Sequence, residues 1–136
     1  MMYRKLGFAE LAAAVLQVLR ENTAYDVYDA VPEDAESPFL FVEVVGKRDS
    51  SSKTTWKETF VLHIHCIAKP SRARTEVYQM IQKAEEAMTA PLELPQGVEC
   101  LTQTETGVQA VQLDETGEWH AVLGYEIMTS YGLKCK

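Results

Sequence analysis

Two histidines separated by a single isoleucine are the strongest hint of metal chemistry in this sequence. In a β-strand, His63 and His65 would place both imidazoles on the same face of the sheet, a spacing that can hold a metal ion. Two ligands are too few, so further ligands would have to come from His120 or from a carboxylate elsewhere. The same face would carry Lys57 and Thr59, which is typical of half-exposed sheet surface. We therefore expect no resident metal and no cofactor.

No arrangement of residues in the sequence predicts an enzyme. A glycine-rich phosphate loop, a Gly-x-Ser-x-Gly elbow, a His-Glu-x-x-His motif and a separated pair of carboxylates in an apolar setting are all missing. Cys66 falls on the predicted core face of its strand, where burial keeps a thiol protonated and inert. Cys100 and Cys135 complete a set of three cysteines without CxxC spacing, so we expect free thiols. We predict no catalytic residues.

A cluster of positive charge stands out in an otherwise acidic chain. The chain has 13 basic and 20 acidic residues, for a net charge of −7. A solvated loop tip would explain the cluster, and so would an electrostatic contact with an acidic subunit or partner. A tryptophan beside it is either an anchor for that contact or a half-buried residue at a strand start. We call the candidate interaction residues the hairpin cluster: Lys47, Arg48, Asp49, Lys53, Trp56 and Lys57.

The hairpin cluster lies in a predicted β-hairpin. Residues Phe39–Val45 and Trp56–Ala68 have strand composition, and the polar run Gly46–Thr55 joins them. This run is too long and too charged for a minimal turn, which predicts a loop that projects from the body. We expect residues 47–53 to be mobile in the free protein and to become ordered on assembly, where their basic side chains pair with carboxylates of a neighbour.

The remaining elements follow from the spacing of apolar residues. Helical spacing predicts one helix over Phe8–Arg20 and a second from a Ser71 N-cap to about Thr89. Strands are predicted over Tyr25–Val31, within Val98–Leu113 and over Trp119–Tyr131, with a turn at Asp114–Gly117. The predicted core comprises Leu11, Val15, Leu19, Leu40, Val42, Phe60, Leu62, Ile64, Val77, Ile81, Leu123, Tyr125 and Ile127.

This order of elements, α-β-β-β-α-β-β, favours an α+β fold. We predict a single domain spanning residues 1–136, with one antiparallel or mixed β-sheet, two helices packed on one face and a long projecting β-hairpin. The composition, 46% hydrophobic and 24% charged, is that of a folded soluble domain. The longest apolar runs are too short for a membrane span, and the N-terminus lacks the apolar core of a secretory signal, so we expect a cytoplasmic protein.

Several segments, taken in order, resemble the tail-completion or tail-terminator proteins of long-tailed phages and prophages. These segments are Tyr28–Pro32, the predicted hairpin, and the strand Phe60–Ala68 followed by Ser71–Glu76 and a helix. A closing β pair near Asp114–Ala121 completes the pattern. The resemblance covers nearly the whole chain and rests on the pattern and order of fold-forming segments.

The resemblance implies a structural protein that forms a ring, typically a hexamer, on the head-proximal end of the tail tube. Such a ring stops tube growth and offers a surface to the head-completion or connector protein. The implied partners are other copies of the chain, the tail tube protein and the connector, with no membrane. The implied location is the virion tail, after assembly in the host bacterial cytoplasm. DNA would only pass through, and an acidic lumen would repel it.

The competing interpretation is a non-enzymatic α+β ligand- or metal-binding regulatory module. It would hold a metabolite or a metal on the sheet face that carries His63 and His65. A small hydrolase, the third class, would need a nucleophile and base that the sequence does not offer. Self-association separates the first two classes, because a ring component oligomerises alone or on meeting the tail tube, whereas a regulatory module changes stability with a small ligand.

Overall fold

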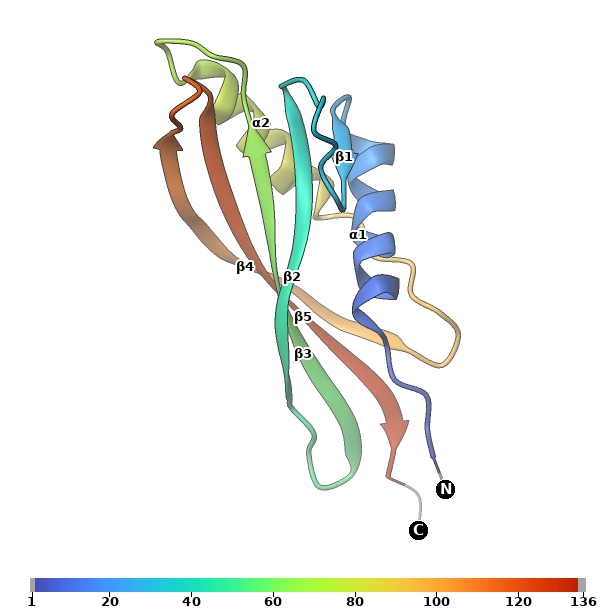
Figure 1. The fold of residues 1–136 in the computed structure, drawn as a ribbon. Coiled ribbons are helices and arrows are strands. Elements are labelled where there is room, and N and C mark those ends of the chain that lie inside the picture. Colours follow the sequence, from blue (N-terminus) through green and yellow to red (C-terminus); the bar gives the residue numbers. More distant parts are fainter. Residues whose placement is uncertain (1, 135–136) are drawn as a thin grey trace.

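Residues 2–134, which the computed structural model describes, form two helices and five strands (Figure 1). Cys135 lies outside the described residues. The order of elements confirms the predicted α+β class, with one long strand in the region that the sequence left open. The elements are α1 (Phe8–Asn22), β1 (Asp26–Tyr28), β2 (Phe39–Asp49), β3 (Thr55–Ile67), α2 (Thr75–Ala87), β4 (Glu99–Leu113) and β5 (Trp119–Leu133).

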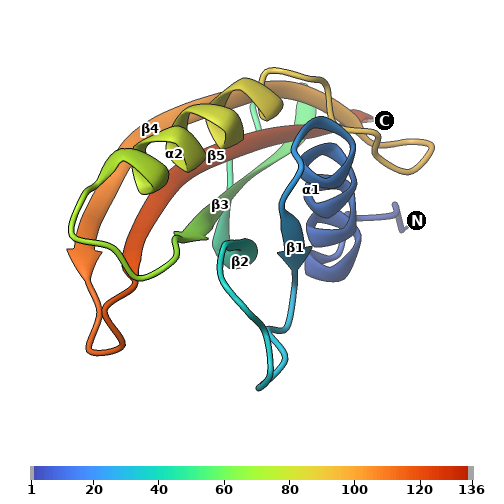
Figure 2. The ribbon, with the colours of Figure 1, turned by 90° about the horizontal axis from the view of Figure 1, so that it is seen from above.

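The strands form one mixed sheet in the order β1-β2-β3-β5-β4. Only the short pairing of β1 with β2 is parallel, and the other neighbours are antiparallel. Bulges interrupt β2, the pairing of β3 with β5, and β4 at three places. Bulges bend strands and increase their twist, and Figure 2 shows β4 and β5 curving around α2. The curved sheet therefore has a concave face that can enclose a core.

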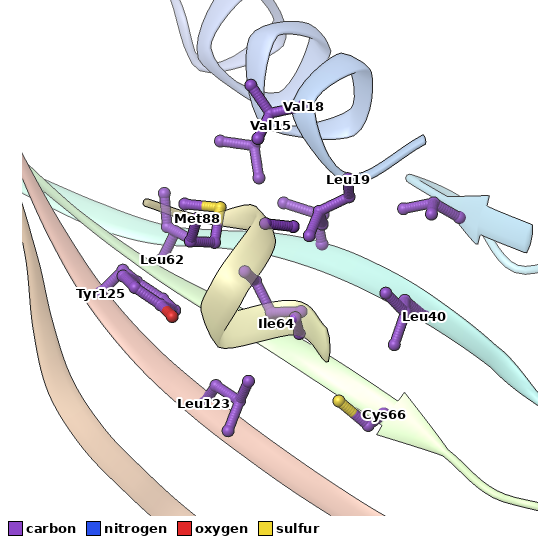
Figure 3. Packing of buried hydrophobic residues seen from close by; sticks show 14 of the residues in the cluster. Val15, Val18, Leu19, Leu40, Leu62, Ile64, Cys66, Met88, Leu123 and Tyr125 are labelled. Atoms are coloured by element: carbon purple, nitrogen blue, oxygen red, sulfur yellow. The ribbon is translucent and has the colours of Figure 1, made fainter. Parts of the chain in front are cut away.

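Both helices pack on this concave face and build the core with it (Figures 2 and 3). All predicted core residues are buried except Ile81, which is only partly buried because the stripe of α2 that faces the sheet runs through Val77, Met80 and Ala84. The core also includes Leu6 and Leu92, which lie outside the helices and strands and so carried no periodic signal. Within the described residues, neither helix combines the length and apolar character needed to cross a bilayer.

Two predicted boundaries were wrong for local reasons. Ser71 is not the N-cap of α2, which begins at Thr75 after Arg74. The Ser71 hydroxyl instead accepts a hydrogen bond from the backbone N–H of Ala73 at 3.1 Å, so it stabilises a turn ahead of the helix. The first strand is limited to Asp26–Tyr28, because only these residues pair with β2.

The predicted loop Gly46–Thr55 was also too long. β2 continues to Asp49 and β3 begins at Thr55, so that Lys47 pairs with Phe60 and Arg48 with Thr59. The backbone N–H of Ser50 donates to the Lys57 carbonyl at 2.9 Å, and that of Ser52 donates to the Thr55 carbonyl at 3.0 Å. Figure 1 shows the hairpin extending past the start of α1, near both chain ends. The hairpin projects, but its loop is short and hydrogen-bonded.

We predict that Leu62→Ala will destabilise the fold by about 2–5 kcal/mol, because Leu62 is fully buried beneath the helices and its loss leaves a cavity. Urea unfolding followed by circular dichroism measures the change. Leu113→Ala is the matched control, because Leu113 is 56% exposed on β4, and it should change the free energy of unfolding by less than about 0.5 kcal/mol. A loss below about 1 kcal/mol for Leu62→Ala would contradict the packing described here.

Candidate assembly surface and histidine cluster

The inner face of the projecting hairpin is covered by the N-terminal segment, residues 2–7. The Tyr3 ring stacks on Trp56, with ring centroids 5.1 Å apart and an interplanar angle of 23°. Leu6 is buried, and its backbone N–H donates to the Tyr131 hydroxyl at 3.2 Å. The Lys134 ammonium also lies over the Trp56 ring, 4.5 Å from its centroid. Trp56, which the sequence suggested as an anchor for a partner, is therefore already engaged within its own chain.

Glu58 is the charged centre of this contact. Its side chain is only 7% exposed and accepts a hydrogen bond from the Tyr131 hydroxyl at 2.6 Å. The ammonium groups of Lys47 and Lys5 lie 3.3 and 3.4 Å from its carboxylate. Burial raises the pKa of Glu58, but the hydrogen bonds from Tyr131 and Lys47 and the charges of both lysines outweigh burial and lower this pKa below its ordinary value. Glu58 thus joins the N-terminal segment, β2 and β5.

Two further members of the hairpin cluster also have partners in the chain. Arg48 donates to Glu126 at 3.0 Å across the sheet, which raises the pKa of the guanidinium. This pair is largely exposed, so it adds little stability. Asp49 accepts hydrogen bonds from the hydroxyl and backbone N–H of Ser51, at 2.6 and 3.1 Å, which lower its pKa. The cluster therefore organises the hairpin tip as well as charging it.

Lys53 and Lys57 are the members of the hairpin cluster that remain available. In the part of the chain that the structure describes, neither ammonium forms an ion pair. Lys53 is exposed in the turn, and Lys57 is half-buried at the start of β3. The predicted contact of the hairpin cluster with a neighbour stays a prediction, and these two lysines carry the positive charge of the cluster that is unpaired within the described chain.

Sequence reasoning missed Glu58 and the N-terminal segment as parts of this surface. Glu58 falls on the same strand face as Phe60 and Leu62. A carboxylate that continues a core stripe was therefore the signal available in the sequence. Tyr3 and Lys5 precede α1 in a segment without periodicity, and they carried no comparable signal.

A second cluster of functional groups lies on the opposite, outer face of the sheet, and we call it the histidine cluster. His65 Nε2 is 3.0 Å from Glu43 Oε1, and His65 Nδ1 is 2.8 Å from His120 Nε2. The His120 ring also lies near a carboxylate, with Nδ1 3.5 Å from Asp114 Oδ2. His63 Nδ1 is 3.9 Å from Glu43 Oε1. The cluster therefore comprises Glu43, His63, His65, Asp114 and His120.

The sheet and one aromatic ring hold the histidine cluster in place. Cross-strand pairing sets Glu43 opposite His63 and Phe41 opposite His65. The Phe41 ring stacks on His65 with centroids 4.1 Å apart and an interplanar angle of 4°. Burial lowers the pKa of His65, although hydrogen bonding to Glu43 opposes this effect. The structure thus supplies both kinds of partner, His120 and a carboxylate, that the sequence could not place beside the two histidines.

The outer edge of the sheet is the third exposed feature. β4 pairs with β5 on one side only, so its other side presents unpaired backbone groups. Leu101, Val108 and Leu113 are exposed along it. Between its bulges, β4 pairs regularly with β5 over Thr102–Glu105. Bulges on an edge strand discourage uncontrolled pairing with other strands.

Comparisons with known proteins identify relatives of the whole chain. A family model described as "Putative tail termination protein" matches residues 2–136. Among solved structures, a chain of the "Virion of native gene transfer agent (GTA) particle" superposes with a TM-score of 0.77 at 20% sequence identity, covering 90% of this chain and 96% of that chain. This likeness shows a shared fold. A search of curated proteins found no match.

We predict that Glu58→Gln will cost about 1–3 kcal/mol of stability at pH 7, because it removes a charged acceptor from Tyr131 and two lysines. Because the folded-state pKa of Glu58 is lowered, this contribution is fully present above the ordinary value of 4.5 and is lost as the pH falls through the folded-state pKa. Chemical unfolding of both proteins between pH 7 and pH 3 should therefore show the difference shrinking with acid.

Glu99→Gln is the matched control for this pH series, because Glu99 is exposed on β4. It should leave stability unchanged within about 0.5 kcal/mol at every pH. A difference between wild type and Glu58→Gln that stays constant from pH 7 to pH 3 would show that the Glu58 charge is not the stabilising feature.

Proposed function

We propose that this chain, which belongs to the family described as "Putative tail termination protein", closes the head-proximal end of a phage-type tail tube as a ring of identical subunits. The observation that carries this proposal is the extent of the family match, which covers residues 2–136. The chain is a structural protein of the virion tail and not an enzyme. Its partners are further copies of itself, the tail tube protein and the protein that connects the tail to the head.

Ring formation requires two different surfaces of one subunit that recognise each other. The hairpin end supplies a basic surface through Lys53 and Lys57, which have no ion pair among residues 2–134. The chain as a whole has a net charge of −7, so a neighbouring copy offers carboxylates to these lysines. Contacts of this kind increase the rate of encounter more than the final affinity.

The direct test of the proposal is tail length. Deleting this gene from the element that encodes it should give tails of irregular, excessive length that carry no heads, as seen by negative-stain electron microscopy. Restoring the gene should restore uniform tails with heads attached. Tails of normal length joined to heads in the deletion strain would contradict the proposed function.

Ring formation itself is tested by measuring mass in solution. Light scattering of the purified chain, alone and mixed with the tail tube protein, should give a species that is a defined multiple of 15.3 kDa. Six copies is the number expected from the resemblance to tail terminators. A chain that stays monomeric alone and in contact with tail tubes would contradict ring formation.

We predict that the double variant Lys53→Glu/Lys57→Glu will slow tail completion by about tenfold or more while leaving the fold intact, because it reverses the unpaired charges of the hairpin end. Its free energy of unfolding should change by less than about 0.5 kcal/mol. Raising the salt concentration should slow the wild type in the same way, because salt screens exposed charges. Lys47 and Arg48 are left unchanged because they pair with Glu58 and Glu126.

The matched control is Lys69→Glu/Lys83→Glu, which changes the net charge equally at exposed positions outside the hairpin. This control should complete tails at the wild-type rate. Equal slowing by both double variants would indicate an effect of net charge, and no slowing by either would remove the hairpin end from the mechanism.

A further inference from the structure

Three ligand atoms of the histidine cluster converge on the outer face of the sheet. One carboxylate oxygen of Glu43 and one ring nitrogen each of His63 and His65 all lie within 4.8 Å of one another. Around a tetrahedral zinc ion, with bonds of about 2.0–2.1 Å, neighbouring ligand atoms are roughly 3.3 Å apart. Glu43 Oε1 and His65 Nε2 are already 3.0 Å apart, and Glu43 Oε1 and His63 Nδ1 are 3.9 Å apart. The His63 and His65 nitrogens are at most 4.8 Å apart, so side-chain rotations that bring them closer would let all three atoms contact one ion.

A line of contacts backs His65 on the side away from Glu43. His65 Nε2 lies 3.0 Å from Glu43 Oε1, and His65 Nδ1 lies 2.8 Å from His120 Nε2. A neutral imidazole carries a single N–H. When His65 Nε2 binds an ion, that hydrogen is on Nδ1, where His120 Nε2 can accept it.

The gap between His65 and Glu43 is where an ion would bind. With an ion on His65 Nε2, the ring donates its Nδ1–H to His120 Nε2, and His120 Nδ1 lies 3.5 Å from Asp114 Oδ2. A metal-bound histidine that donates its other N–H to a further partner is the usual arrangement at protein metal sites.

We propose that Glu43, His63 and His65 bind one divalent transition-metal ion of the zinc class, with His120 and Asp114 orienting His65 from behind. Two imidazoles and one carboxylate favour zinc, cobalt or nickel over magnesium or calcium, which prefer oxygen ligands. Three protein ligands leave a position open for water or for a donor atom of another molecule. This site goes beyond the proposed function and does not depend on it, and it revises the expectation of no resident metal.

Isothermal titration of zinc chloride into the full chain, prepared without a polyhistidine tag, tests the proposal. One ion should bind per chain, and the double variant His63→Gln/His65→Gln should lose binding. The positioning residue His120, as His120→Gln, should weaken affinity by about 10–100-fold. Glu43→Gln should weaken affinity by at least about tenfold. The matched control is Glu126→Gln, which removes the charge of a carboxylate on β5 outside the histidine cluster. Its affinity for zinc should stay within about twofold of wild type.

Cobalt supplies a readout that does not depend on the variants. The absorption spectrum of the cobalt-loaded wild type should show nitrogen and oxygen ligation without a thiolate charge-transfer band. A thiolate band would assign binding to a cysteine and overturn the proposal. The proposal is equally overturned if the wild type shows no saturable zinc binding, or if binding survives in a folded His63→Gln/His65→Gln chain.

Discussion

The pairing of β3 with its two neighbours is the constraint on which the rest of the structure depends. β3 pairs with β2 on one side and, from Thr55 to Ile67, with β5 on the other. Because side chains alternate across a strand, one alignment assigns every residue of β3 to a face. Phe60, Leu62 and Ile64 then face the helices, while His63 and His65 face outward. A slip of one residue would bury the histidines and expose the core, so folding stability and the histidine cluster are specified together.

The same alternation explains the unusual position of Glu58. This carboxylate continues the inner stripe of β3 at the hairpin end, and the Phe8 side chain at the start of α1 is already 45% exposed. Apolar burial therefore gives way here to a charged contact, in which Lys5, Lys47 and Tyr131 satisfy the carboxylate. The Lys5 side chain is 52% exposed, so it keeps part of its hydration. This partial hydration limits the desolvation cost that fully buried ion pairs incur.

Strand periodicity predicted the fold class and most of the core, but it could not predict the cross-strand alignment. The hairpin tip pairs Lys47 with Phe60, and continuing that pairing along β2 would set Glu43 against Ile64, on the core face. A bulge between Val44 and Gly46 shifts the pairing by one residue and places Glu43 opposite His63 instead. The polar residues at the tip obscured the strand ends, because both faces of a projecting hairpin tolerate polar side chains. The position of the Glu43 carboxylate beside the histidines thus depends on a bulge that no local sequence pattern predicts.

The position of the helices leaves the outer face of the sheet uncovered. Both helices cover the concave face, so the outer face carries polar groups that need no further covering, such as the Arg48–Glu126 pair. At the free edge, β4 folds Thr106 and Gln109 closely over Gly124, where a β-carbon would clash with both side chains. These bulged residues break the row of backbone groups that another strand could pair with. A strand of another molecule could therefore pair with β4 only over the short stretch Thr102–Glu105, and side chains would supply most of any contact made at this edge.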